Sequence, residues 1–129
     1  MTDYRGYRGK VIDGGEWVQG YYLVQPTTLG DKTHIIYDGE YEHAVDPSTV
    51  GQYTGLQDKN EVDIFDGDVI KVPDLYETPE NTNTTYHNEV IGYEYGAFTM
   101  DGQPLFDDWD YIREECEVIG NRWDNPELL

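Results

Sequence analysis

Four Asp-Gly pairs divide this chain into short segments that are rich in aromatic and β-branched residues. Glycine readily adopts the positive φ of tight hairpin turns, and aspartate can accept hydrogen bonds within such turns. The segments between the pairs carry the side chains that suit half-buried strands. The pattern therefore predicts a mainly β chain built from short antiparallel strands, with little helix. The pairs are Asp13-Gly14, Asp38-Gly39, Asp66-Gly67 and Asp101-Gly102.

Each pair can be placed between particular strands. The first pair predicts a hairpin of residues 10–12 and 17–24, and the second predicts a reversal between residues 33–37 and 41–45. Residues 63–72 are expected to form a strand pair or one bulged strand around the third pair. A final strand is expected at residues 117–120.

The remaining segments are less regular. Pro47 biases the residue before it away from helix, so residues 46–49 are a candidate junction within a single domain of residues 1–129. Residues 73–88 carry two prolines and no periodicity, which predicts a flexible loop. Residues 107–115 are expected to form a short helical turn or a loop, and residues 125–127 resemble a helix start.

Charge constrains the function more than any motif does. The chain has 8 basic and 27 acidic residues, a net charge of −19, and −15 of this charge falls in residues 61–129. Nucleic-acid phosphates would be repelled, whereas a basic surface on another protein would be attracted. No signal peptide or long apolar segment is visible, so a cytoplasmic location without membrane association is expected.

The residues that could carry chemistry do not form a known site. A calcium-binding EF-hand loop starting at Asp58 would place Val62, Asp63 and Val69 where other ligands or glycine are required. The three histidines lack the spacing of metal ligands and are expected to be solvated or hydrogen-bonded. Cys116 is the sole cysteine, so it forms no internal disulfide, and its acidic neighbours would raise its pKa. We therefore expect no enzyme, no metal and no cofactor.

Two non-enzymatic functions remain open at this point. In the first, the acidic second half imitates the charge of a nucleic acid and occupies a basic groove on a DNA- or RNA-binding protein. In the second, the charge maintains solubility and exposed aromatic side chains anchor a partner. A metal-dependent or carboxylate enzyme and a structural or assembly role are alternatives, and self-association is left open.

Three segments of the sequence resemble one family. They are YRGKVIDGGEWVQGYYL near the N-terminus, QYTGLQDKNEVDIFDGDVI in the middle and CEVIGNRWDNPELL at the end. All three are similar to the YopX family of phage and prophage proteins, in the same order along the chain. One departure is Glu61, which stands where the family usually has glycine, so the reversal after Lys59-Asn60 must form without it. We expect the acids of the middle segment to be mainly solvated.

The resemblance implies a compact barrel-like or sandwich arrangement of strands and a small accessory protein of a phage or prophage, in the cytoplasm of a bacterial host. It implies no catalytic residue. By analogy with other small acidic phage proteins, the leading hypothesis is a protein that binds a host protein with a basic surface, such as a defence or nucleic-acid enzyme. The candidate partner-binding residues are Asp107, Asp108, Asp110, Glu114, Glu115 and Glu117.

Overall fold

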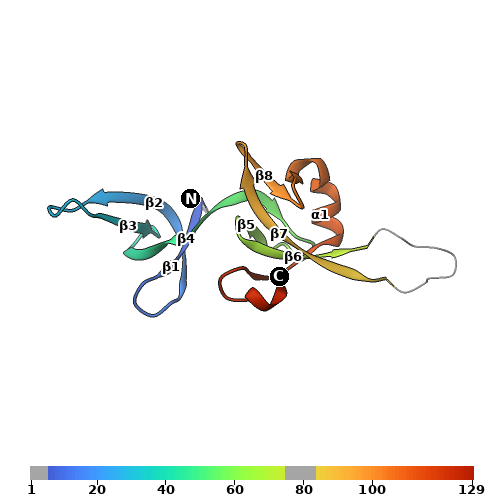
Figure 1. Cartoon of the computed structure of the whole chain (residues 1–129), viewed down its shortest axis with the longest axis horizontal. Coiled ribbons are helices and arrows are strands. Elements are labelled where there is room, and N and C mark those ends of the chain that lie inside the picture. Colours follow the sequence, from blue (N-terminus) through green and yellow to red (C-terminus); the bar gives the residue numbers. More distant parts are fainter. Residues whose placement is uncertain (1–5, 75–83) are drawn as a thin grey trace. The chain divides into compact units, whose positions relative to one another are not determined.

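The chain forms two compact units, Met1–Tyr53 and Thr54–Leu129, and the mainly β prediction is confirmed (Figure 1). The computed structural model describes residues 6–74 and 84–129. No helix in these two ranges is long and apolar enough to cross a membrane. The organisation as a single domain stays a prediction. The elements are β1 (Tyr7–Val11), β2 (Trp17–Pro26), β3 (Lys32–Tyr37), β4 (Glu42–Gln57), β5 (Asp63–Phe65), β6 (Asp68–Pro73), β7 (Tyr86–Glu94), β8 (Ala97–Met100), β9 (Gln103–Pro104), the 3-10 helix η1 (Leu105–Asp108), α1 (Trp109–Glu115), β10 (Glu117–Asn121) and the 3-10 helix η2 (Pro126–Leu128).

Strands β1 to β4 of the first unit pair in sequence order, and β1 also pairs with β4. These antiparallel pairings make the sheet partly ring-like, and the expected barrel-like or sandwich arrangement is confirmed only as two antiparallel sheets. The reversal between β3 and β4 is held by Asp38, whose carboxylate accepts the backbone N–H groups of Glu40 and Tyr41 and contacts His43. These bonds, the one from Tyr41 first, lower the pKa of Asp38 to about 2.

Strand β4 continues through the predicted junction at residues 46–49 as a bulge. Its register against β1 changes from Gly51 opposite Arg8 to Asp46 opposite Lys10. Within the bulge, the Lys10 N–H donates to the Thr49 hydroxyl over 2.9 Å, and that hydroxyl donates to the Asp46 carbonyl over 2.6 Å. Proline is tolerated here because a bulge leaves residues outside the ladder of hydrogen bonds.

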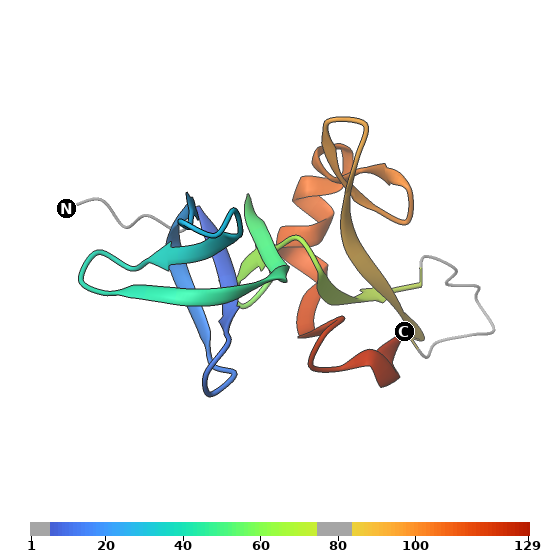
Figure 2. The same ribbon diagram turned by 60° about the vertical axis from the view of Figure 1, so that its left-hand side comes forward.

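The second unit has an antiparallel sheet in the order β10-β6-β7-β8-β9. Helix α1 lies against this sheet (Figure 2), and its Ile112 packs into a core with Ile70 and Ile91. Of the two alternatives for residues 107–115, a helical turn or a loop, the structure has the helical one, because η1 leads directly into α1. The loop predicted at residues 73–88 falls largely on residues 75–83, which lie outside the described residues.

The turn after β4 is organised by a buried carboxylate. Asp58 is 1% exposed, and its oxygens accept N–H groups from Asn60, Val62 and Val118 at 2.8, 2.9 and 2.8 Å. Asp68 is equally buried and accepts the N–H of Phe65. The expectation that the acids of this segment are mainly solvated is therefore wrong for these two, because their side chains replace missing backbone partners.

Glu61 completes this turn with a φ of +62°, a conformation that glycine adopts more easily than any other residue. We predict that Glu61→Gly raises the free energy of unfolding by about 0.5–1 kcal/mol. Chemical denaturation followed by circular dichroism measures this change. Glu61→Ala is the matched control, because it removes the side chain but keeps Cβ. An equal gain from Glu61→Ala would contradict the backbone explanation.

Candidate functional site

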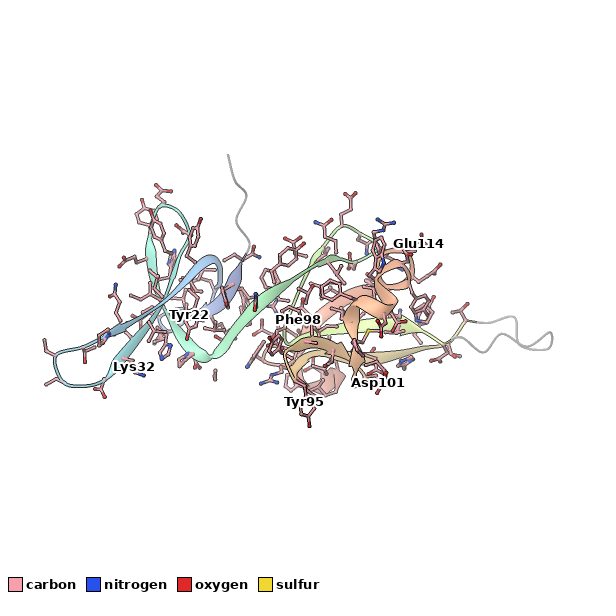
Figure 3. All side chains as sticks on the ribbon, turned by 90° about the horizontal axis from the view of Figure 1, so that it is seen from above. Tyr22, Lys32, Tyr95, Phe98, Asp101 and Glu114 are labelled. Atoms are coloured by element: carbon pink, nitrogen blue, oxygen red, sulfur yellow. The ribbon has the colours of Figure 1, made fainter. Side chains whose placement is uncertain are left out.

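Five of the six predicted partner-binding acids lie on consecutive elements of the second unit. Asp107 and Asp108 belong to η1, and Asp110, Glu114 and Glu115 belong to α1. All five are exposed, whereas Ile112 faces the core. Figure 3 labels Glu114 on the outer side of the helix. The sixth acid, Glu117, is half-buried on β10.

Asp110 and Glu114 are four residues apart in α1 and therefore project from one side of this helix, and Asp107 precedes them in η1. We call these three residues the acidic stripe. Among the described residues, Arg113 forms a 3.9 Å ion pair with Asp110 of this stripe, and both side chains are exposed. A pair of this kind contributes little energy in water, so most of the negative charge of the stripe remains uncompensated.

Two aromatic side chains accompany the acidic stripe. Phe106 is 53% exposed and Trp109 is 43% exposed, and both lie within the same stretch of η1 and α1. The Arg113 guanidinium lies over the Trp109 ring, 4.9 Å from its centroid. Partly exposed aromatic side chains of this size are common anchors in protein interfaces. The structure thus places acidic and aromatic side chains on the same short segment.

Glu117 and Cys116 have other environments. Glu117 lies 3.9 Å from the ammonium group of Lys59. Cys116 is fully buried, and burial, followed by the charges of Glu115 and Asp108, raises its pKa to about 12. The expected direction of this shift agrees with the structure. A buried thiol of this kind is a poor nucleophile, because only the thiolate is reactive.

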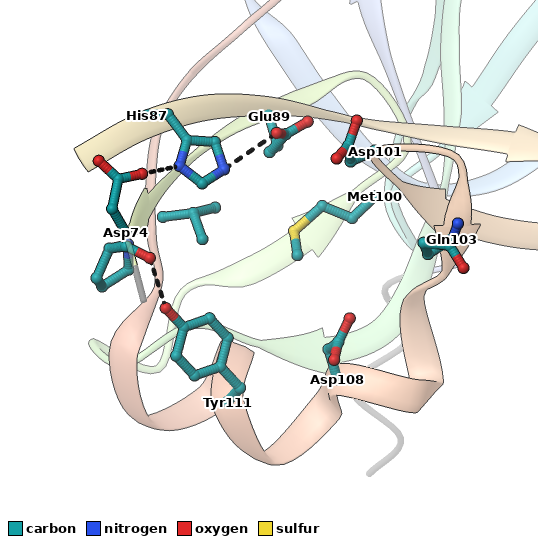
Figure 4. A pocket seen from close by; sticks show the side chains of 10 residues that line it. Asp74, His87, Glu89, Met100, Asp101, Gln103, Asp108 and Tyr111 are labelled. Carbon is teal, nitrogen blue, oxygen red and sulfur yellow. Dashed lines mark hydrogen bonds and ion pairs between the residues drawn. The ribbon is translucent and has the colours of Figure 1, made fainter. Parts of the chain in front are cut away.

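A cavity of about 290 Å³ opens beside the start of the helix. Its floor contains Val72 and Met100, both buried, and the ring of Tyr111 forms part of its wall (Figure 4). The Tyr111 hydroxyl donates to the Pro73 carbonyl over 2.7 Å, which fixes the ring. The polar wall comes from four carboxylates, one amide and one imidazole. These residues are Asp74, Glu89, Asp101, Asp108, Gln103 and His87.

His87 lies between two carboxylates. Its Nδ1 is 2.6 Å from Asp74 Oδ1, and its Nε2 is 3.1 Å from Glu89 Oε1. The Thr85 hydroxyl also donates to Asp74. Because both ring nitrogens already have partners, the imidazole serves to order this wall and has no free nitrogen for a substrate proton.

The carboxylates of the cavity differ in their affinity for protons. The Thr85 hydroxyl, followed by His87, lowers the pKa of Asp74. Burial, followed by the charge of Asp101, raises the pKa of Glu89, although His87 opposes this shift. Burial is also the main cause of the raised pKa of Tyr111. The cavity is therefore an electronegative environment in which a further negative charge is unfavourable.

In the parts of the chain that the structure describes, no three His, Cys, Asp or Glu side chains are placed to share a metal ion. The three histidines each have a side-chain partner, as expected. His34 contacts the Tyr22 hydroxyl over 2.5 Å, and His43 and His87 contact carboxylates.

The cavity is not visible in the sequence. Its polar wall joins Asp74 after β6 with His87 and Glu89 on β7, and these segments meet only because the two strands pair. One local signal was present, because His87 and Glu89 are two residues apart and therefore project from the same face of a strand.

Comparisons with known proteins agree on one family. The family model described as "YopX protein" matches residues 6–129, and no curated protein matches the chain significantly. The crystal structure of protein EF1440 from Enterococcus faecalis is similar with a TM-score of 0.57 and 22% identity over 99% of both chains. The crystal structure of protein yopX from Bacillus subtilis is similar with a TM-score of 0.52 and 21% identity, over 96% of this chain and 97% of that one. At these identities the two structures support the fold alone.

Proposed function

The chain belongs to the YopX family, and from this premise we propose that it is a non-enzymatic accessory protein of a phage or prophage that binds a host protein with a basic surface. More specifically, the protein acts in the cytoplasm of a bacterial host. Its carboxylates occupy the groove in which a host defence enzyme or nucleic-acid enzyme binds nucleic acid.

The observation that carries the proposal is the acidic stripe of Asp107, Asp110 and Glu114 beside the exposed rings of Phe106 and Trp109. Carboxylates in such an array attract a basic surface over a distance and accelerate the encounter. The aromatic side chains then supply apolar contact area at the same place. A surface that only maintained solubility would not need exposed aromatic side chains beside its charge.

The charge distribution supports the same part of the chain. Residues 54–129 carry 19 of the 27 acidic residues and 4 of the 8 basic residues, a net charge of −15. Two of these acids, Asp58 and Asp68, are buried and serve the fold. Most of the other acids among the described residues of this unit are exposed and can contact a partner.

The test is capture of host proteins from a bacterial lysate, eluted by increasing salt. We compare the intact protein with a stripe variant, D107N/D110N/E114Q, and with a matched control, D31N/E40Q/E42Q. Both variants remove three exposed negative charges, but the control changes only the first unit. We expect the stripe variant to bind the captured basic protein about tenfold more weakly and to elute at lower salt, while the control is unchanged. Equal losses in both variants, or capture of no basic protein at low salt, would contradict the proposal.

A further inference from the structure

We propose that the cavity beside η1 binds an alkylguanidinium group, with Asp101 and Asp108 as its charge partners. This inference rests on the proposed function and deepens it. A partner with a basic surface carries arginine side chains, and each of these ends in an alkylguanidinium group. The cavity and the acidic stripe share the segment η1, where Asp108 lines the cavity and Asp107 begins the stripe.

The charge of the cavity selects a cation. Among the described residues that line it, four are carboxylates and none is a lysine or an arginine. Asp74 and Glu89 already contact His87. In the described part of the chain, the side chains of Asp101 and Asp108 have no hydrogen bond or ion pair comparable to the contacts of Asp74 and Glu89 with His87. They approach from different elements, because Asp101 follows β8 and Asp108 ends η1 (Figure 4).

The apolar surfaces of the cavity select the shape of that cation. Val72 and Met100 provide a floor for a methylene stem, and the fixed ring of Tyr111 provides a face on which a planar cation can stack. A volume of about 290 Å³ is at the small end of ligand cavities and suits one side chain better than a nucleotide.

The guanidinium group fits this arrangement better than an ammonium ion does. It is planar and weakly hydrated, and its five N–H donors point outward in several directions, so one group can bond carboxylates on two sides of a cavity. An ammonium ion is compact and strongly hydrated, and it would gain less from the apolar floor. Burial raises the pKa of Glu89, and a cation in the cavity would lower it again by stabilising the ionised form.

The test uses small probes on the full-length protein, so it does not depend on any partner. Isotope-labelled protein is titrated with N-acetyl-L-arginine methylamide, its citrulline counterpart, its lysine counterpart and n-butylguanidine, and amide shifts are followed by NMR. We expect saturable shifts at Met100, Asp101 and Tyr111 with the arginine probe, and at least about tenfold weaker binding of the uncharged citrulline probe. The pKa of Glu89, measured from its side-chain carbon shift, is expected to fall when the arginine probe binds.

Two variants and a matched control complete the test. D108N and D101N each weaken binding of the arginine probe about fivefold, and asparagine suits the positive φ of residue 101. E94Q removes an exposed negative charge of the same unit outside the cavity and outside the acidic stripe, and it leaves the affinity unchanged. Equal binding of the citrulline probe, tighter binding of the lysine probe, an unchanged affinity in D108N and D101N, or no saturable shift at about 10 mM probe would overturn the proposal.

Two further comparisons identify the source of the alkylguanidinium group. Tighter binding of acetyl-Gly-Arg-Gly-amide than of n-butylguanidine supports an arginine side chain of a protein, and the reverse order supports a free guanidine compound. Failure of the lysate experiment together with binding of the arginine probe would remove the proposed function and leave the cavity as an alkylguanidinium site.

Discussion

Asp58→Ala lowers the free energy of unfolding by about 3 kcal/mol or more. The carboxylate is 1% exposed, and it accepts three backbone N–H groups, from Asn60, Val62 and Val118. Two of these bonds close the turn after β4, and the third ties the turn to β10 across 60 residues of sequence. Alanine removes the acceptor of all three N–H groups, including that of Val118, which is half-buried on β10.

Urea denaturation of the purified variants measures this loss. D107A is the control, because it removes an exposed carboxylate of the same unit. We expect its free energy of unfolding to stay within about 0.5 kcal/mol of the original. D58N keeps one acceptor oxygen and is expected to lose about half as much as D58A. A loss below about 1 kcal/mol in D58A would show that the turn does not depend on the carboxylate.

Local signals in the sequence predicted most of the strands. The Asp-Gly pairs mark real reversals, and at three of them the glycine has a positive φ close to +100°, as at Gly39. The sequence could not predict that β4 continues past Pro47, because the reason is tertiary. A bulge accommodates the proline only when β1 lies alongside and donates to Thr49.

Of the candidate site, the sequence predicts the acidic segment but not the cavity. The acids of η1 and α1 are adjacent in sequence, so composition alone located them. The cavity joins Asp74 after β6, His87 on β7 and Tyr111 on α1, and only the strand register and the packing of the helix bring them together. A pattern of charges along a chain predicts a surface, whereas a cavity requires knowledge of which distant segments meet.

The middle segment illustrates why a family signature need not mark a functional site. Asp58 and Asp68 are its two buried acids, and both accept backbone N–H groups of the same segment. Their role is to hold turns, and neither carboxylate lines the cavity. The exposed acids of η1 and α1, on which the proposed function rests, lie outside this signature.

Gly67→Ala is the second substitution with a large expected effect, a loss of about 3 kcal/mol. Gly67 has a φ of +91°, and a Cβ placed there would lie 2.3 Å from Cζ3 of Trp123. The backbone has little freedom to move away. Its N–H donates to the Ile91 carbonyl over 2.8 Å, and its carbonyl accepts the N–H of Arg122 over 2.9 Å.

A comparison with Gly96 separates the cost of the positive φ from the cost of the steric clash with the Trp123 ring. Gly96 has a φ of +83°, but a Cβ there would meet nothing within 4 Å. G96A should therefore lose about 1 kcal/mol, the cost of the backbone conformation alone. In a W123A background, where the ring is absent, G67A should also lose about 1 kcal/mol beyond W123A itself. The difference between the two backgrounds, measured as a double-mutant cycle in urea, gives the energy of the contact between residue 67 and the Trp123 ring. Additive losses in this cycle would show that backbone strain alone explains the glycine.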